Sequence, residues 1–266
     1  MIALDQQLRR QLVSLSLSLI LATASNIMGF SNVAYAVTQS DSQLLSSTSS
    51  TDNSAGSARD IFRAAYENRY TWNQQFPGYS ALVELRQGNE DYKGYIRINS
   101  DLSVEVTGID KEDARQTVEN QLRMIIIHRR RVSFEVAHKN HTYQFGATDK
   151  TGAVEIFEKG DTTAHYKVFH QQLTQVNRIL GQTAVTVNLL DSLVTKEGYL
   201  ATHYRTIFRQ PQNAQVLGEQ ESEDTYKKVG SYYLLKHQVI RDFEQGQQTT
   251  TEINFTDIQL LPKSAT

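Results

Sequence analysis

Two histidines, His138 and His141, are separated by two residues, and their spacing is the one in this chain that best suits a shared metal ion. On the two sides of a tight turn, imidazoles face each other closely enough to bind one zinc ion. A zinc site needs three or four ligands, however, and this pair has no nearby cysteine, aspartate or glutamate that completes it. We therefore interpret the pair as an exposed hairpin tip and predict no metal site.

Four polar residues are candidates for acid–base catalysis, which requires side chains that converge in one pocket. They lie on different predicted strands, so the sequence shows no convergence: they are Asp191, His203, His237 and Glu252. The chain also has no recognisable nucleophile triad or phosphate-binding loop. We predict a protein that is not an enzyme, with no catalytic residues and no cofactor, and we rank a hydrolase below the binding functions.

A run of acidic side chains, Glu219, Glu221, Glu223 and Asp224, offers oxygen ligands for calcium. The run lacks the glycine and the bidentate glutamate of a calcium loop. Charges of this kind protect an exposed strand from aggregation. The pattern therefore predicts a solvated edge strand.

Arg129, Arg130 and Arg131 concentrate positive charge at the end of a predicted helix. Such charges complement the negative end of the helix dipole, which is the interpretation we favour. The same three side chains also suit an anionic lipid head group, and this alternative stays open.

Five apolar or aromatic side chains are candidates to line a cavity. Tyr66 and Trp72 belong to the densest aromatic cluster, which we expect to fasten the first helix to the sheet. Leu200, Tyr204 and Phe208 alternate along one predicted strand and form its drier face. If the sheet is curled, these residues are expected to enclose an apolar ligand.

The first 36 residues have the pattern of an export signal. Arg9 and Arg10 precede an apolar run at 12–22, and Ala34-Tyr35-Ala36 is a small-residue cleavage site, so cleavage is expected after Ala36. A retained membrane anchor over residues 12–30 is the alternative. A Sec signal fits better than a twin-arginine signal. The expected location is the periplasm or the thylakoid lumen.

The rest of the chain divides by composition. Residues 37–56 are rich in serine and poor in apolar side chains, which predicts a disordered linker. Residues 57–262 are expected to form one β-rich domain, followed by a tail at 263–266. Because the chain has no cysteine, this domain must fold by burial alone. A net charge of −2 argues against nucleic acid as a partner.

Short motifs place the elements of the domain. Ser57 and Asp60 have the spacing of a capping box, which predicts a helix that buries Ile61, Phe62 and Ala65. A three-stranded meander follows over 79–107, and then a second helix that Asp110 is expected to cap. Nine further strands are predicted, at 131–138, 141–147, 153–158, 163–170, 183–190, 199–209, 215–229, 232–243 and 249–261. In the last strand, the apolar parity changes near 256–257, which indicates a β-bulge.

These elements predict a mainly β fold of the α+β class. About 11 antiparallel strands are too many for a flat sheet, so we expect a curled sheet or incomplete β-barrel with an N-terminal helix and one helical lid. A β-sandwich is the competing arrangement. The two differ in function, because a curled sheet can enclose a cavity whereas a sandwich is packed solid.

The sequence over 58–72, with Phe76-Pro77-Gly78-Tyr79, resembles a family of uncharacterised exported proteins of cyanobacteria and plastids, the domain of unknown function 3386. The resemblance covers about 58–261 and implies lineage and compartment but no activity. The order of elements is also similar to that of lipoprotein carriers, the LolA-like half-barrels, which implies an apolar cavity. No residue role is transferred from that likeness.

These observations favour a non-enzymatic extracytoplasmic binding protein. The leading hypothesis is a carrier or chaperone for a lipid or a pigment-like molecule. The alternative is a protein-interaction or assembly factor for a membrane complex, which needs an exposed apolar patch in place of an enclosed cavity.

Overall fold

The computed structural model describes residues 56–160 and 163–262. The predicted signal peptide with its cleavage site at Ala36, the linker up to residue 55 and the tail at 263–266 lie outside the described residues. Within the described ranges, we find no helix with the length and apolar character needed to cross a membrane.

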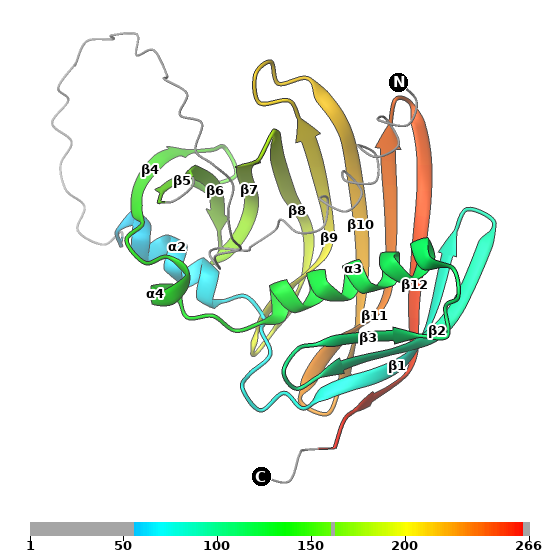
Figure 1. Cartoon of the computed structure of the whole chain (residues 1–266). Coiled ribbons are helices and arrows are strands. Elements are labelled where there is room, and N and C mark those ends of the chain that lie inside the picture. The colour runs from blue at the N-terminus through cyan, green and yellow to red at the C-terminus, as the bar shows by residue number, and fades with distance from the viewer. Residues whose placement is uncertain (1–55, 161–162, 263–266) are drawn as a thin grey trace, which may run out of the picture.

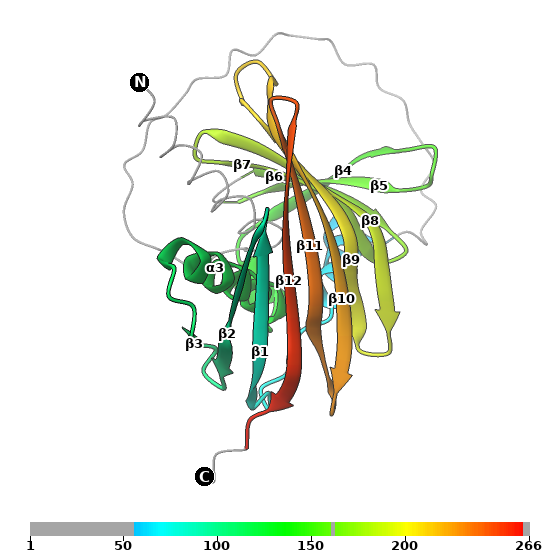
Figure 2. The same cartoon turned by 90° about the vertical axis from the view of Figure 1, so that its right-hand side faces the viewer.

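Antiparallel strands form one sheet in the order β3-β2-β1-β12-β11-β10-β9-β8-β7-β6-β5-β4. The sheet curls but stays open, and β3 and β4 are its edges (Figures 1 and 2). Because twist accumulates between neighbouring strands, a sheet of this size curls instead of staying flat. The predicted mainly β fold with a curled sheet is confirmed, with 12 strands in the described chain.

The strands follow one another as hairpins in two groups. The N-terminal group is β1 (Gly78–Gln87), β2 (Glu90–Asn99) and β3 (Val104–Thr107). The long group is β4 (Thr142–Thr148), β5 (Val154–Lys159), β6 (Thr163–Phe169), β7 (Gln172–Leu180), β8 (Thr183–Thr195), β9 (Gly198–Arg209), β10 (Val216–Val229), β11 (Tyr232–Glu244) and β12 (Gln247–Leu260).

The first and last strands join the two groups, since β1 pairs with β12 in antiparallel register. This register shifts between Ser80 and Leu82, opposite residues 256–259, and Asp257 has a positive φ of 49°. The predicted bulge is therefore confirmed. The extra residue keeps Phe255 and Ile258 on the buried face although their parities differ.

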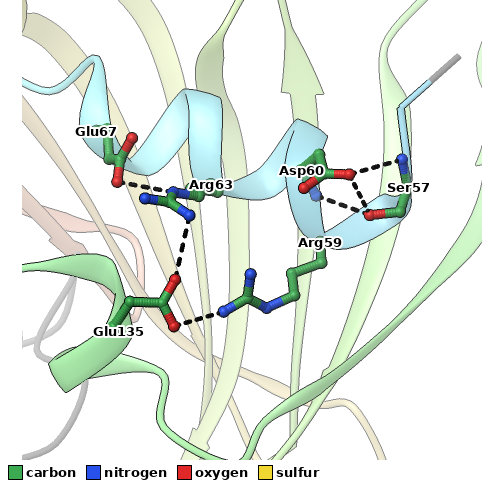
Figure 3. A network of polar contacts seen from close by, with 6 residues as sticks. All are labelled: Ser57, Arg59, Asp60, Arg63, Glu67 and Glu135. Atoms are coloured by element: carbon green, nitrogen blue, oxygen red, sulfur yellow. Dashed lines mark hydrogen bonds and ion pairs between the residues drawn. The ribbon is translucent and has the colours of Figure 1, made fainter.

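Helix α2 (Ala58–Glu67) begins with the predicted capping box. The Asp60 amide donates to Ser57 Oγ, and the Ser57 amide donates to Asp60 Oδ2, both at 3.2 Å (Figure 3). On the exposed side of α2, Arg59 and Arg63 both donate to Glu135, at 2.7 and 3.1 Å. These contacts hold α2 against the short helix α4 (Phe134–Ala137).

Helix α3 (Glu112–Arg129) crosses the open side of the curled sheet (Figure 1). Ala114, Val118 and Leu122 lie on one face and are buried, as the spacing predicts. Its C-terminal end is fixed by the Trp72 amide, which donates to the Arg129 carbonyl at 2.7 Å. The predicted cap was wrong: Lys111 is the N-cap residue, and its side chain makes no capping hydrogen bond but donates to Glu90 and Tyr92 on β2.

Two apolar cores lie under the helices. One packs α3 against the strands of the N-terminal group and β11–β12, and it includes Val118, Leu122 and Phe255. The other packs α2 and α4 against β5–β9, and it includes Phe62 and Phe134. The three helices thus shield the inner face of the sheet, which remains the drier face.

Three predictions about elements were wrong. The predicted strand at 131–138 contains α4 instead, because Phe134 and Ala137 have helical spacing and are buried together. Strand β7 was missed, since it follows a turn in which His170 and Gln171 adopt positive φ of 48° and 56° without a glycine. The acidic run lies on β10, which is an inner strand of the sheet and not an edge.

Candidate functional site

A cavity of about 90 Å³ lies between the C-terminal half of α3 and the inner face of β7–β11. Most of its wall is apolar and consists of Met124, Ile125, Leu173, Val176, Val187 and Leu189. Five consecutive strands contribute to this wall because the sheet curls beneath α3. An apolar wall with a few polar groups is the usual composition of a small-molecule site.

A chain of hydrogen bonds forms one polar part of the cavity. Arg129 Nη2 donates to the Tyr226 hydroxyl at 2.8 Å, and Gln238 Nε2 donates to Asp224 Oδ1 at 2.7 Å. The Tyr226 hydroxyl lies 3.0 Å from Asp224 Oδ2 and 3.1 Å from the Ala201 carbonyl, and its single proton serves one of them at a time. Burial raises the pKa of Asp224 to about 6, against the effect of these hydrogen bonds.

Arg69 forms the other polar part of the cavity and is only 9% exposed. Its Nε donates to the Tyr66 carbonyl at 2.9 Å, and its guanidinium lies 3.9 Å above the Tyr66 ring. No carboxylate forms an ion pair with it among the described residues. Burial lowers the pKa of Arg69, although an arginine side chain keeps its proton at any physiological pH.

The backbone positions Arg69 directly. A parallel bridge joins Arg69 to Tyr199 on β9, with hydrogen bonds from Tyr70 N to the Tyr199 carbonyl and from Tyr199 N to the Asn68 carbonyl, both at 2.9 Å. Gly198 has a φ of +123°, and a Cβ there would lie 2.5 Å from the Asn68 carbonyl oxygen. Only glycine allows this close approach.

The predicted cavity residues separate in the structure. Tyr204 lines the cavity, whereas Leu200 and Trp72 are buried in the core under α3. Tyr66 and Phe208 are buried in the core under α2 and do not belong to the cavity lining.

The arginine triplet also separates. Arg129 lines the cavity, while Arg130 and Arg131 are exposed and do not. Sequence reasoning missed Arg69 and the inward position of Asp224. A signal for Asp224 was present, because alternate residues of β10 point inward and are polar there, as Gln220 and Ser222 also show.

A second polar cluster surrounds Glu158, a buried carboxylate on the inner face of β5. Its Oε1 accepts from His138 Nδ1 at 2.5 Å, His141 Nδ1 at 2.7 Å and the Tyr143 hydroxyl at 2.9 Å, and its Oε2 accepts from the Tyr166 hydroxyl at 2.6 Å. Burial alone raises the pKa of this carboxyl, but the hydrogen bonds outweigh burial and lower the pKa to about 2.

Burial lowers the pKa of His138 in this cluster, despite the contact with Glu158, and so favours the neutral imidazole. Its Nδ1 carries the proton, since a carboxylate can only accept, and its buried Nε2 has no hydrogen-bond partner within residues 56–160 and 163–262. The rings of Phe62 and Tyr66 surround His138 at centroid distances of 5.0 and 4.8 Å. The contact is therefore a short hydrogen bond between the imidazole and the carboxylate in an apolar, aromatic environment.

The tip that we predicted at His138 and His141 is not an exposed hairpin. The two residues flank the turn after α4, and the pairing of β4 with β5 places Glu158 beside them. The three side chains thus have potential ligand atoms within 4.8 Å of one another. Two ligands of one tetrahedral zinc ion are about 3.3 Å apart. The observed separations of 2.5 and 2.7 Å between nitrogen and carboxylate oxygen are those of hydrogen bonds.

The residues that we considered for acid–base catalysis lie elsewhere. His203 pairs with Glu221 at 2.6 Å and His237 with Glu252 at 2.7 Å, in cross-strand contacts outside the cavity. Asp191 is exposed on β8. The acidic residues of β10 pair with basic residues of β9 and β11, for example Glu219 with Arg205 and Glu223 with Arg241.

Among curated proteins, none matches this chain. Solved structures with some similarity include a putative outer membrane lipoprotein-sorting protein domain from Vibrio parahaemolyticus, at 11% identity and a TM-score of 0.30, covering 76% of this chain and 91% of that one. A DUF1329 family protein from Desulfovibrio piger ATCC 29098 matches at 8% identity and a TM-score of 0.24, with the same coverage of 76% and 91%. MucB in complex with MucA(peri) matches at 9% identity and a TM-score of 0.20, covering 78% and 99%. Similarities this distant assign neither a ligand nor an activity.

A family match is found over residues 53–261, which is nearly the whole of the described domain. This agrees in extent with the resemblance noted at 58–261. The chain belongs to the family described as protein of unknown function, DUF3386.

Proposed function

We propose that this protein is a non-enzymatic extracytoplasmic binding protein that carries an apolar molecule, such as a lipid or a pigment-like compound. The observation that supports this is the cavity beneath α3, whose wall is largely apolar and comes from five neighbouring strands. The extracytoplasmic location rests on the export pattern of residues 1–36.

The size of the cavity limits how the ligand is held. Pockets that enclose a drug-sized molecule measure about 300–1,000 Å³, whereas this cavity measures about 90 Å³. The cavity therefore accommodates one end of the ligand, and the rest of the molecule extends along the open side of the sheet.

The test uses the full chain isolated from its own cells. We expect native mass spectrometry to show a stoichiometric small molecule, identified after organic extraction, and the stripped protein to bind the neutral apolar dye N-phenyl-1-naphthylamine. Ala201→Trp fills the cavity and is expected to weaken dye binding at least tenfold, an effect of about 1.4 kcal/mol. The matched control is Val194→Trp, because Val194 is 68% exposed on β8 and outside the cavity.

Two results would overturn the carrier. One is a clean apo mass together with no dye uptake by the stripped protein. The other is equal loss of dye binding in both tryptophan variants, since that would place the dye outside the cavity.

A second candidate function is that of an assembly factor for a membrane complex. Leu190, Leu193 and Val194 are between 38% and 68% exposed within five residues of β8. Apolar side chains that gather on a surface mark interaction sites. Replacing all three with serine is expected to abolish the capture of a partner in a cross-linking experiment and to leave dye binding unchanged.

A further inference from the structure

We propose that the ligand of this cavity carries an anionic head group, a carboxylate or a phosphate monoester, which Arg69 and Arg129 bind. This inference rests on the proposed carrier function and names the chemistry of one end of the ligand. The predicted triplet at 129–131 does not form this binding site as a unit, because Arg130 and Arg131 are exposed outside the cavity.

Arg69 provides the first argument. Its guanidinium is desolvated, and it cannot escape the cost of burial by losing its proton. The Tyr66 carbonyl accepts a hydrogen bond from Nε only, and the guanidinium makes a cation–π contact with the Tyr66 ring. The two terminal nitrogens have no hydrogen-bond partner among the residues that the structure describes, and Arg69 lines the cavity. A carboxylate or phosphate in the cavity would accept from both nitrogens at once through two of its oxygens.

The balance of charge provides the second argument. Arg69 and Arg129 line the same cavity and repel each other, and Asp224 is the one carboxylate that the described part of the chain contributes to the lining. Both oxygens of Asp224 are engaged by Gln238 and Tyr226, so no direct ion pair joins it to either guanidinium. Burial also favours its protonated form. The lining therefore has an excess of positive charge that an anion relieves.

The placement of the apolar wall provides the third argument. Val176 and Val187 on β7 and β8, and Met124 on α3, line the same cavity as the two guanidiniums. A free inorganic anion would leave this surface uncovered. An amphiphile with an anionic end and a hydrocarbon chain satisfies both parts of the lining.

The experiment compares three ligands that share one alkyl chain. Laurate, dodecyl phosphate and dodecanol are titrated into the stripped full chain by displacement of N-phenyl-1-naphthylamine, below their micelle concentrations. We expect laurate or dodecyl phosphate to bind at least about tenfold more tightly than dodecanol. The relative affinities of laurate and dodecyl phosphate identify which of the two head groups the site prefers.

Variants locate the effect. Arg69→Gln and Arg129→Gln are each expected to reduce the ratio of anionic-ligand affinity to dodecanol affinity from at least about tenfold to near one. Arg130→Gln is the matched control, because this arginine is exposed next to Arg129, and it is expected to behave as the wild-type protein. If Arg69→Gln fails to fold, Arg69→Lys keeps the charge and tests the planar fork, and Arg129→Gln tests the site independently.

The outcomes separate the two proposals. If dodecanol binds as tightly as the anionic ligands, the anionic head group is excluded while the apolar carrier stands. The same conclusion follows if Arg130→Gln abolishes the preference and Arg129→Gln does not. If the dye binds but none of the three ligands displaces it, the anionic head group is excluded as well; the proposed function itself fails only if the stripped wild-type protein takes up no dye and shows a clean apo mass.

Discussion

Replacing Glu158 with glutamine is expected to destabilise the fold, because this carboxylate organises the corner where β4–β6 meet α4. Its side chain is 3% exposed and accepts hydrogen bonds from His138, His141, Tyr143 and Tyr166. The amide of Glu158→Gln places an NH2 group where an oxygen now accepts, so at least one buried donor is left without a partner.

The expected magnitude follows from the pKa of Glu158. The folded protein lowers this pKa from 4.5 to about 2, despite the opposing effect of burial. Each pKa unit corresponds to about 1.4 kcal/mol, so the ionised carboxylate contributes about 3 kcal/mol to the free energy of unfolding. Because the side chain is almost fully buried, water screens its interactions little and the full contribution of about 3 kcal/mol is expected.

The stability that Glu158 contributes depends on pH in one direction. Because the folded pKa is lower than the unfolded one, the contribution is complete above pH 4.5 and is lost as the pH falls towards 2. His138 acts in the same direction at higher pH, since burial lowers its pKa below 6.5 and the neutral form is the stable one. The wild-type protein is therefore expected to lose stability on acidification.

Urea denaturation at pH 7, 5, 4 and 3 measures this effect. At pH 7 we expect Glu158→Gln to lower the free energy of unfolding by about 3 kcal/mol, and we expect the difference from wild type to shrink at pH 3. Glu244→Gln is the control, because Glu244 is exposed at the end of β11. A difference below about 1 kcal/mol at pH 7, or one that is equal at pH 7 and pH 3, would refute the reasoning.

Three further predictions use the same denaturation assay. Gly198→Ala is expected to cost more than about 2 kcal/mol, because its Cβ would meet the Asn68 carbonyl at 2.5 Å, whereas alanine at the open glycine Gly246 should cost less. Ser57→Ala should cost about 1 kcal/mol by removing the N-cap of α2, and a cost near zero would contradict the capping box. Asp224→Asn should raise the free energy of unfolding at pH 8 by about 3 kcal/mol and change it little at pH 3.5, because a folded pKa of about 6 penalises only the ionised form. A loss of stability at pH 8 would show that the carboxylate is needed.

Local sequence patterns were sufficient to predict most helices and strands. The capping box at Ser57 and Asp60 involves contacts three residues apart, and alternation along β9 or β12 reports which face of a strand is dry. The bulge at Asp257 was visible because a change of parity must be compensated within the same strand. Such signals need only neighbours in the sequence.

Predictions failed where distant segments decide the structure. The sequence at 131–138 alternates like a strand, but the apolar space under α2 accepts Phe134 and Ala137 from a helical turn. The glutamates of β10 resemble those of an edge strand, yet their partners are basic residues on β9 and β11. Charge alternation alone does not distinguish water from a neighbouring strand as the partner of a side chain.

The amino-acid sequence by itself determined the β-rich class, the capped first helix, the curl of a sheet with this many strands and the absence of disulfide bonds. Only the tertiary structure brought His138 and His141 to Glu158, and Arg69 to Arg129. His138 and His141 reach Glu158 because β4 pairs with β5, whereas Arg69 and Arg129 meet through the bridge at Tyr199 and the hydrogen bond from the Trp72 amide to the Arg129 carbonyl. The residue type indicates what a side chain can bind, but the path of the chain determines which side chains come into contact.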